Sequence, residues 1–248
     1  MAILITRPQP DNDTTSAALR GRGLAVLAAP MLRFEQMPFQ DDADAKYGAA
    51  IVTSANALRA IADQPVRDSL IKLPLFAVGD KTADAARELG FADVISADGD
   101  ANALRELMVA SVKAKRLKKS STLLYLAGAD LARDLAGELG GRGFSVVTHT
   151  TYRMAPVTSL PPDVVAALAT GGIEAVLHYS RRSARAFFTA AQAAAVEISA
   201  LATLHGCLSD SIASVARDAG ATQVMVARTP DEPALFNLLG RANAPLSR

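Results

Sequence analysis

The feature that most constrains the fold is an internal repeat whose copies occur in a particular order. Three kinds of segment each occur twice along the 248-residue chain. The first kind contains a Gly-Arg-Gly turn, the second a serine turn, and the third an aspartate turn with a glycine after the following helix. The matched pairs are residues 19–33 with 139–153, residues 51–61 with 177–187, and residues 76–98 with 206–228. Three matches in a consistent order favour duplication over coincidence.

The order of the repeats predicts how the chain divides into domains. Along the chain the kinds follow the order first, second, third, first, second, third. One complete set, from about residue 47 to residue 153, therefore lies inside the other, which is assembled from the two ends of the chain. The predicted parts are a discontinuous domain of residues 1–35 and 157–248, an inserted domain of residues 38–153, and linker strands at about 33–38 and 152–157. Prolines 38, 156, 161 and 162 suit such linkers, because proline breaks helices and favours an extended preceding residue.

Short apolar runs alternate with alanine-rich helical patterns throughout the chain. The predicted strands include residues 3–6, 49–53, 75–78, 94–96, 123–126, 145–148, 175–178 and 224–227. Strands separated by helices imply right-handed crossovers and parallel sheets. We therefore expect an α/β fold of two similar, flavodoxin-like parallel-sheet domains, one inserted in the other and joined by a two-stranded linker.

Composition excludes several classes of partner. With 26 basic and 25 acidic residues, the net charge of +1 provides no global field for nucleic acid or an anionic membrane. The basic run at residues 113–119 has no interleaved aromatic residues and predicts a solvated helix end. Cys207 is the only cysteine and lies in an apolar stretch, which predicts a buried, unreactive thiol. Because there is neither a signal-peptide pattern nor a long apolar run, we expect a cytoplasmic protein without membrane or nucleic-acid partners.

Standard catalytic and cofactor motifs are missing from the sequence. No dinucleotide glycine fingerprint or Walker lysine motif follows a predicted strand, which argues against a nucleotide-dependent transferase. Paired carboxylates and a serine elbow are also absent. His149, His178 and His205 are too scattered along the chain to predict a metal site, so that each is expected to be structural or exposed. We expect neither a metal nor an organic cofactor.

Polar turns follow most of the predicted strands. In open parallel sheets, ligands bind beyond the carboxyl ends of the strands, where helix starts present N–H groups to carboxylates or phosphates. These turns comprise residues 6–8, 53–56, 79–82, 127–130, 179–183 and 209–211. Ser, Thr, Asn and Asp are also ordinary helix caps, so that capping alone is the alternative at any single turn.

The motifs, in this order, resemble those of the uroporphyrinogen-III synthases across nearly the whole chain. The matching parts are residues 6–8, 51–57, 77–83 with 89–90, 128 with 131–139, the strand ending at 152–153, and 180–183. The resemblance implies an active site in the cleft between two domains and no cofactor. It also implies the reaction, in which hydroxymethylbilane closes to uroporphyrinogen III with loss of water and inversion of ring D, a step of haem biosynthesis.

The resemblance also implies site residues. Tyr152 matches the family tyrosine and is the expected catalytic acid. Backbone N–H groups, assisted by hydroxyl side chains, are expected to bind the substrate carboxylates. The expected binding residues are Arg7, Thr53, Ser54, Asn56, Thr82, Gly128, Ala129, Ser180, Arg181, Ser183 and Ser211.

The sequence departs from the family in the second half of the chain. Residues 179–183 replace a common Thr-Ser-Pro-Ser turn, and residues 209–212 replace Gly-Pro-Thr-Thr, so that only Ser211 is transferred from the latter turn. Arg181 and Arg182 either bind a substrate carboxylate or simply solvate their helix. We expect a monomer. A cytoplasmic two-lobed protein that binds or senses a small molecule is the alternative function.

Overall fold

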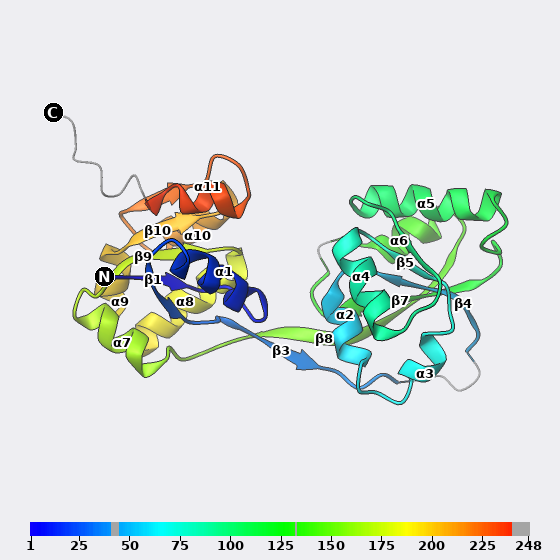
Figure 1. Ribbon diagram of the computed structural model, residues 1–248, viewed down its shortest axis with the longest axis horizontal. Helices are drawn as coiled ribbons and strands as arrows, with labels where there is room; N and C mark the ends of the chain where they lie inside the picture. Colours follow the sequence, from blue (N-terminus) through cyan, green and yellow to red (C-terminus); the bar gives the residue numbers. More distant parts are fainter. Residues whose placement is uncertain (41–44, 132, 240–248) are drawn as a thin grey trace. The chain divides into compact units, whose positions relative to one another are not determined.

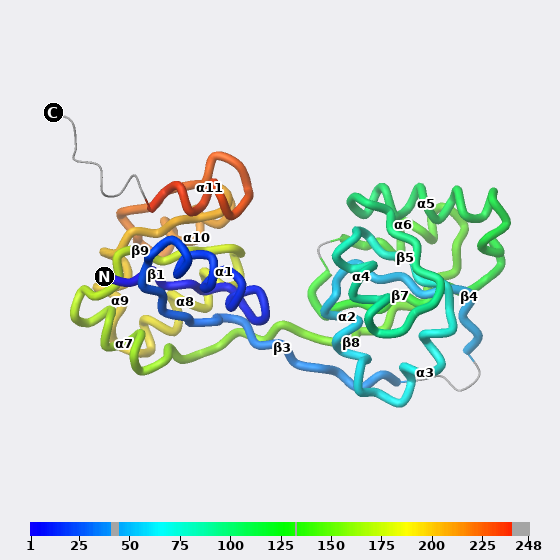
Figure 2. Tube along the Cα trace, viewed as in Figure 1, coloured from blue at the N-terminus to red at the C-terminus, as the bar shows by residue number. Residues whose placement is uncertain are grey.

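The computed structural model describes residues 1–40, 45–131 and 133–239 (Figure 1). Contacts divide the chain into two units: unit 1 comprises Met1–Phe34 and Ala155–Arg248, and unit 2 comprises Glu35–Met154. The chain enters unit 2 along β3 (Leu32–Gln36) and returns to unit 1 along β8 (Ser145–Pro156), a path that Figure 2 traces.

Unit 1 contains a five-stranded sheet in the order β11-β10-β9-β1-β2, whose neighbouring strands are parallel. Its strands are β1 (Ala2–Ile5), β2 (Ala25–Ala28), β9 (Ile173–His178), β10 (Leu204–Cys207) and β11 (Val224–Val226). Its helices are α1 (Asp11–Arg20), α7 (Pro162–Ala169), α8 (Arg181–Ala193), α9 (Glu197–Ala202), α10 (Asp210–Asp218) and α11 (Glu232–Phe236). Because side chains alternate along a strand, Ile3 and Ile5 pack with α1 and α11, whereas Leu4 packs with α7, α8 and α10.

Unit 2 contains a six-stranded sheet in the order β3-β8-β7-β4-β5-β6. Its remaining strands are β4 (Tyr47–Val52), β5 (Leu75–Ala77), β6 (Val94–Ser96) and β7 (Thr122–Gly128), and its helices are α2 (Ala55–Ile61), α3 (Arg67–Leu70), α4 (Asp80–Leu89), α5 (Ala101–Lys113) and α6 (Leu135–Gly140). The same alternation applies here. Leu124 and Leu126 pack with α2 and α4, while Leu123 and Tyr125 pack with α5 and α6.

The predicted α/β class with two sheets of mainly parallel strands is confirmed, and repeated segments form equivalent elements. Gly90 directly follows α4 with φ 110°, and Gly220 follows α10 after Ala219 with φ 101°, both in the left-handed region that favours glycine. One pair differs. The second copy of the Gly-Arg-Gly segment leads into one 12-residue strand, β8, but the first copy is divided into β2 and β3. Pro30 lies in the break, where a residue without an N–H cannot donate to a sheet.

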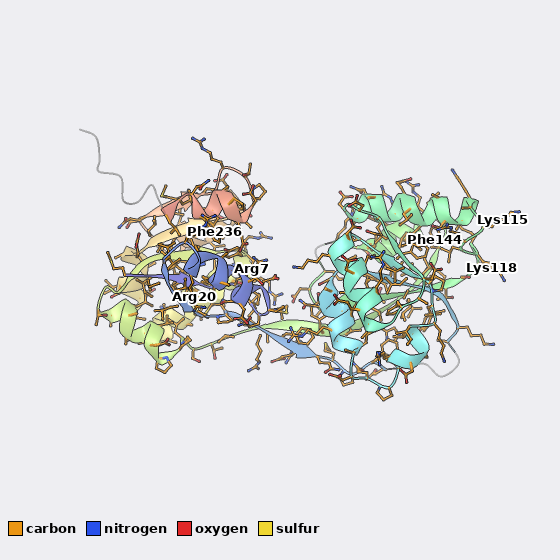
Figure 3. All side chains as sticks on the ribbon, in the orientation of Figure 1. Arg7, Arg20, Lys115, Lys118, Phe144 and Phe236 are labelled. Atoms are coloured by element: carbon orange, nitrogen blue, oxygen red, sulfur yellow. The ribbon has the colours of Figure 1, made fainter. Side chains whose placement is uncertain are left out.

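The structure also bears on three smaller expectations, which concern the basic run, Cys207 and membrane-spanning helices. The basic run begins at the last residue of α5 and continues into an exposed turn, from which Lys115 and Lys118 project outward (Figure 3). Cys207 is fully buried in the core of unit 1, and burial raises the pKa of its thiol to about 12. Within the described residues, every helix is too short or too polar to cross a membrane.

Candidate functional site

The polar turns of unit 2 lie along one edge of its sheet. Strands β8, β7, β4 and β5 are neighbours and run parallel, so that their carboxyl ends meet at the same edge. Gly128 ends β7, and Thr53 directly follows β4. Tyr152 lies opposite Gly128 in the register of β7 and β8. The structure therefore brings three of the predicted site residues to the same edge of unit 2.

The ring of Tyr152 lies against the backbone of Gly128. A Cβ atom added at Gly128 would be 2.7 Å from Cζ of Tyr152 and 2.9 Å from its hydroxyl oxygen. Carbon atoms in contact prefer a separation of about 3.5 to 4.0 Å, so any larger residue would displace the ring. The N–H of Ala129 donates to the carbonyl of Tyr152 at 2.8 Å, which fixes the turn after β7. Gly128 thus positions Tyr152, and the N–H of Ala129 is already used within the protein.

A second tyrosine, Tyr125, lies at this edge beside Thr53. The hydroxyl oxygens of Thr53 and Tyr125 are 3.0 Å apart, and Tyr125 is only 3% exposed. Burial raises the pKa of Tyr125, and the neighbouring Tyr152 adds to this effect, whereas the bond to Thr53 opposes it. Tyr125 therefore stays protonated at neutral pH. Sequence reasoning missed this residue, although an aromatic residue within an otherwise aliphatic strand was a visible signal.

Capping accounts for the serine turn that begins one helix in each unit. Ser54 caps α2 by accepting the N–H of Asn56 at 3.2 Å. Ser180 caps α8 by accepting the N–H of Ser183 at 3.1 Å, and its hydroxyl donates to that of the buried Ser183 at 2.9 Å. Arg181 is exposed at the first position of α8. At these two helix starts, the serine side chains primarily stabilise the helices.

The starts of α4 and α10 lack such a cap, as do those of α1, α3, α7 and α9. Gly79 and Ser209 directly precede helices α4 and α10, and neither of these residues makes a side-chain capping bond. Thr82 is buried in the first turn of α4, whereas Ser211 is exposed in the first turn of α10, 3.1 Å from the hydroxyl of Ser209. Gly79 and Ser209 are equivalent positions of the repeat, whereas Thr82 corresponds to Ile212. A helix start without a side-chain cap is suited to binding an anion.

Arg7 belongs to a charged cluster at the carboxyl edge of unit 1. Its guanidinium donates to Asp11 at 2.9 Å and to Glu232 at 3.0 Å, and it lies 4.8 Å from the centre of the Tyr179 ring. Tyr179 donates to the same oxygen of Glu232 at 3.1 Å. Burial, together with the carboxylate of Glu232, raises the pKa of Tyr179. The sequence did not predict this cluster, because Arg7 and Glu232 are 225 positions apart.

The three histidines do not form a single group, but two of them are in direct contact. His178 in β9 and His205 in β10 are buried, with Nε2 of His178 3.0 Å from Nδ1 of His205. Nε2 of His205 is 3.0 Å from the carbonyl of Ala200, so this nitrogen must donate and Nδ1 must accept from His178. Burial lowers the pKa of His178 well below 6.5 and that of His205 to about 4. The two residues are 27 positions apart in the sequence and meet because β9 and β10 are adjacent strands.

His149 lies elsewhere, stacked on Phe39 at 4.4 Å between ring centres. Across the ranges that the structure describes, no three His, Cys, Asp or Glu side chains are grouped so that they could bind a metal ion.

Comparisons with known proteins agree with this architecture. The family model described as "Uroporphyrinogen-III synthase HemD" matches residues 13–237. No curated protein matches the sequence significantly. The fold is similar to the crystal structure of uroporphyrinogen-III synthetase from Helicobacter pylori 26695, with 15% identity, TM-score 0.64, and coverage of 97% of this chain and 98% of that one. It is also similar to a mutant uroporphyrinogen III synthase from the extremely thermophilic bacterium Thermus thermophilus, with 18% identity, TM-score 0.51 and 98% coverage of both chains.

Proposed function

Because the chain belongs to the uroporphyrinogen-III synthase family, we propose that Tyr152 and the polar turns of its two units close hydroxymethylbilane to uroporphyrinogen III. The chain is a cyclising lyase of tetrapyrrole biosynthesis. The observation that carries the assignment is the family match over residues 13–237, which includes most of both units.

Tyr152 is the proposed general acid. In the first step, the C–O bond of the substrate's hydroxymethyl group breaks as the Tyr152 hydroxyl donates its proton to the leaving oxygen, which departs as water. The pyrrole left behind is an azafulvene cation. A positioned general acid contributes roughly 10² to 10⁴ in rate. The contact of the Tyr152 ring with Gly128 supports this role, because it restricts where the hydroxyl can lie.

Orientation of the substrate accounts for the inverted isomer. The substituted carbon of the last pyrrole attacks the cation and forms a spiro intermediate, which fragments and closes again with ring D reversed. The Tyr152 tyrosinate left by the first step recovers its proton from the ring D carbon that forms the last bond, and ring D thereby becomes aromatic again. Spontaneous closure instead joins the two ends of the linear tetrapyrrole directly. The protein must therefore bind the tetrapyrrole in a folded conformation. Binding in a reactive geometry is itself a large source of rate acceleration.

The substrate's eight carboxylates require several binding points. We propose that the starts of α4 and α10 bind carboxylates through backbone N–H groups, because neither start has a side-chain cap. A charge-assisted hydrogen bond contributes about 1.5 to 3 kcal/mol. The other proposed binding residues are Arg7, Thr53, Ser54, Asn56, Thr82, Gly128, Ser180, Arg181, Ser183 and Ser211; Ala129 is no longer among them, because its N–H already donates to the carbonyl of Tyr152. Of these, Thr53 directly follows β4, and Arg7 lies two residues after the end of β1.

The decisive experiment is an isomer assay with the purified chain and hydroxymethylbilane. We expect mainly the type III product, whereas a reaction without protein gives the product of direct head-to-tail closure. A two-lobed sensor, the alternative function, binds a tetrapyrrole but leaves the product distribution unchanged. That outcome would rule out the proposed activity.

We also propose that the chain is a cytoplasmic monomer. The lone, buried thiol of Cys207 suits a reducing compartment. Light scattering coupled to size exclusion should give a mass near 25.9 kDa. A mass of twice that value would contradict the monomer.

A further inference from the structure

Three side chains from different parts of the fold converge on one carboxylate oxygen in unit 1. Arg7 donates to Oε1 of Glu232 at 3.0 Å, Tyr179 donates to it at 3.1 Å, and Thr15 also donates to it. Arg7 follows β1, Tyr179 follows β9, and Thr15 belongs to α1. A guanidinium and two hydroxyls around a single oxygen form a donor set that matches a carboxylate ligand.

The donors are supported independently of Glu232. Thr15 is fully buried on α1. The second arm of the Arg7 guanidinium pairs with Asp11 at 2.9 Å, and its plane lies over the ring of Tyr179. Neither contact involves the carboxylate of Glu232. The three donors therefore form a site that is organised before a ligand arrives, which lowers the entropic cost of binding.

Glu232 can leave this site without unfolding its helix. It is the first residue of α11, and its side chain is 30% exposed. The cap of α11 is Asp231, which accepts the N–H of Ala234 at 2.8 Å, and the helix is anchored by the buried Leu235 and Phe236. Rotation of the Glu232 side chain alone would move its carboxylate into solvent.

We propose that Arg7, Thr15 and Tyr179 form a carboxylate-binding site and that Glu232 occupies it until a carboxylate of the tetrapyrrole substrate replaces it. This inference rests on the proposed function and assigns one binding point of that substrate. Because Glu232 is part of the same chain, it competes at a high effective concentration. Removing its carboxylate therefore strengthens binding of a polycarboxylate tetrapyrrole.

The test measures the Kd of uroporphyrin III, the stable oxidised form of the product, by its fluorescence in the full-length chain. We expect Glu232→Ala to bind about 10-fold more tightly than the wild type. Tyr179→Phe, added to Glu232→Ala, should reverse most of this gain because it removes one donor. Asp84→Ala is the matched control, since Asp84 pairs with Arg87 at 2.7 Å in unit 2, and its Kd should equal that of the wild type.

Glu232→Gln provides a second variant that removes the charge but keeps the shape, so it decides the question if Glu232→Ala does not fold. Folded Glu232 variants whose Kd is unchanged or larger overturn the inference, because Glu232 then supports the donors instead of competing for them. The isomer assay on the wild type distinguishes a failure of this inference from a failure of the proposed function. If the wild type forms the type III product while the Glu232 variants show no gain, only the carboxylate site is wrong; a wild type that forms none disproves the function.

Discussion

Gly128→Ala tests whether the position of the Tyr152 ring controls catalysis. The added Cβ would lie 2.7 Å from Cζ of Tyr152, 2.9 Å from its hydroxyl oxygen and 3.1 Å from Cε1. Relief of this overlap requires the ring to move by about 0.8 Å, given the usual carbon contact distance of about 3.5 Å. The main chain cannot move away easily, because Ala129 and Tyr152 are hydrogen-bonded across β7 and β8. The ring must therefore move.

A misplacement of about 1 Å at a reacting group can cost about 100-fold in rate. We therefore expect Gly128→Ala to lower kcat by about 100-fold. The free energy of unfolding should fall by about 1 to 3 kcal/mol, the usual cost of overpacking. Timed measurement of the type III isomer gives kcat, and urea titration gives the unfolding free energy.

Gly140→Ala is the matched control, because a Cβ at this helical glycine has no atom within 4 Å. It should leave kcat unchanged and stabilise the chain by up to about 1 kcal/mol, as alanine does in helices. A double-mutant cycle completes the test. If Gly128 acts by positioning the Tyr152 hydroxyl, Gly128→Ala should cost little further rate in a Tyr152→Phe background. Fully additive losses, or a normal kcat in Gly128→Ala, would refute the reasoning.

Three further predictions follow from the same structure. Tyr152→Phe should lower turnover about 10- to 1000-fold while the remaining product stays mainly type III; an unchanged rate in the isomer assay would leave Tyr152 a packing residue. His178 and His205 are neutral when buried but accept protons near pH 6.5 when unfolded, so the free energy of unfolding should decrease as pH falls from 6.5 towards 4. The expected slope is up to about 1.4 kcal/mol per pH unit for each histidine, measured by urea titration; a His205→Gln variant with an unaltered slope would contradict this origin. Chelation and desalting should leave the isomer-forming activity intact, and activity restored only by a metal or nucleotide would show that expectation to be wrong.

Local sequence patterns predicted the elements of the fold well. Apolar runs and helical periodicity placed β4, β5 and β9 within a few residues, because strand and helix periods depend on neighbouring positions. The same logic placed the turns that contain Thr53 and Ser180 at the ends of strands. Residue type then identified the capping serines, since a serine that begins a helix bonds the helix's own N–H groups.

Contacts between distant segments could not be predicted in this way. The pairing of Thr53 with Tyr125 depends on the register of β4 and β7, and the contact of His178 with His205 depends on the order of strands. Neither quantity is encoded in local periodicity. Glu232 was missed for a similar reason. Its contact with Arg7 exists because the N-terminal strand β1 belongs to the same sheet as β9, β10 and β11 from the last part of the chain.

The two copies of the repeat show which positions serve folding and which have diverged. Ser54 and Ser180 are equivalent, and both cap a helix, so duplication has kept this contribution to stability in each unit. The residues directly before these serines differ in type and in hydrogen-bond partner. Thr53 bonds the neutral Tyr125, whereas Tyr179 bonds the carboxylate of Glu232.

Tyr152 has also diverged, because its counterpart in the first copy is the buried, apolar Leu32. Only unit 2 therefore has a hydroxyl at this position of the repeat. The proposed reaction expels a single hydroxyl group, so one general acid is sufficient. The equivalent position in unit 1 was free to become part of the core, and introducing a tyrosine at Leu32 should not replace the function of Tyr152 in a Tyr152→Phe background. Recovery of turnover in such a Leu32→Tyr variant would contradict this division of roles.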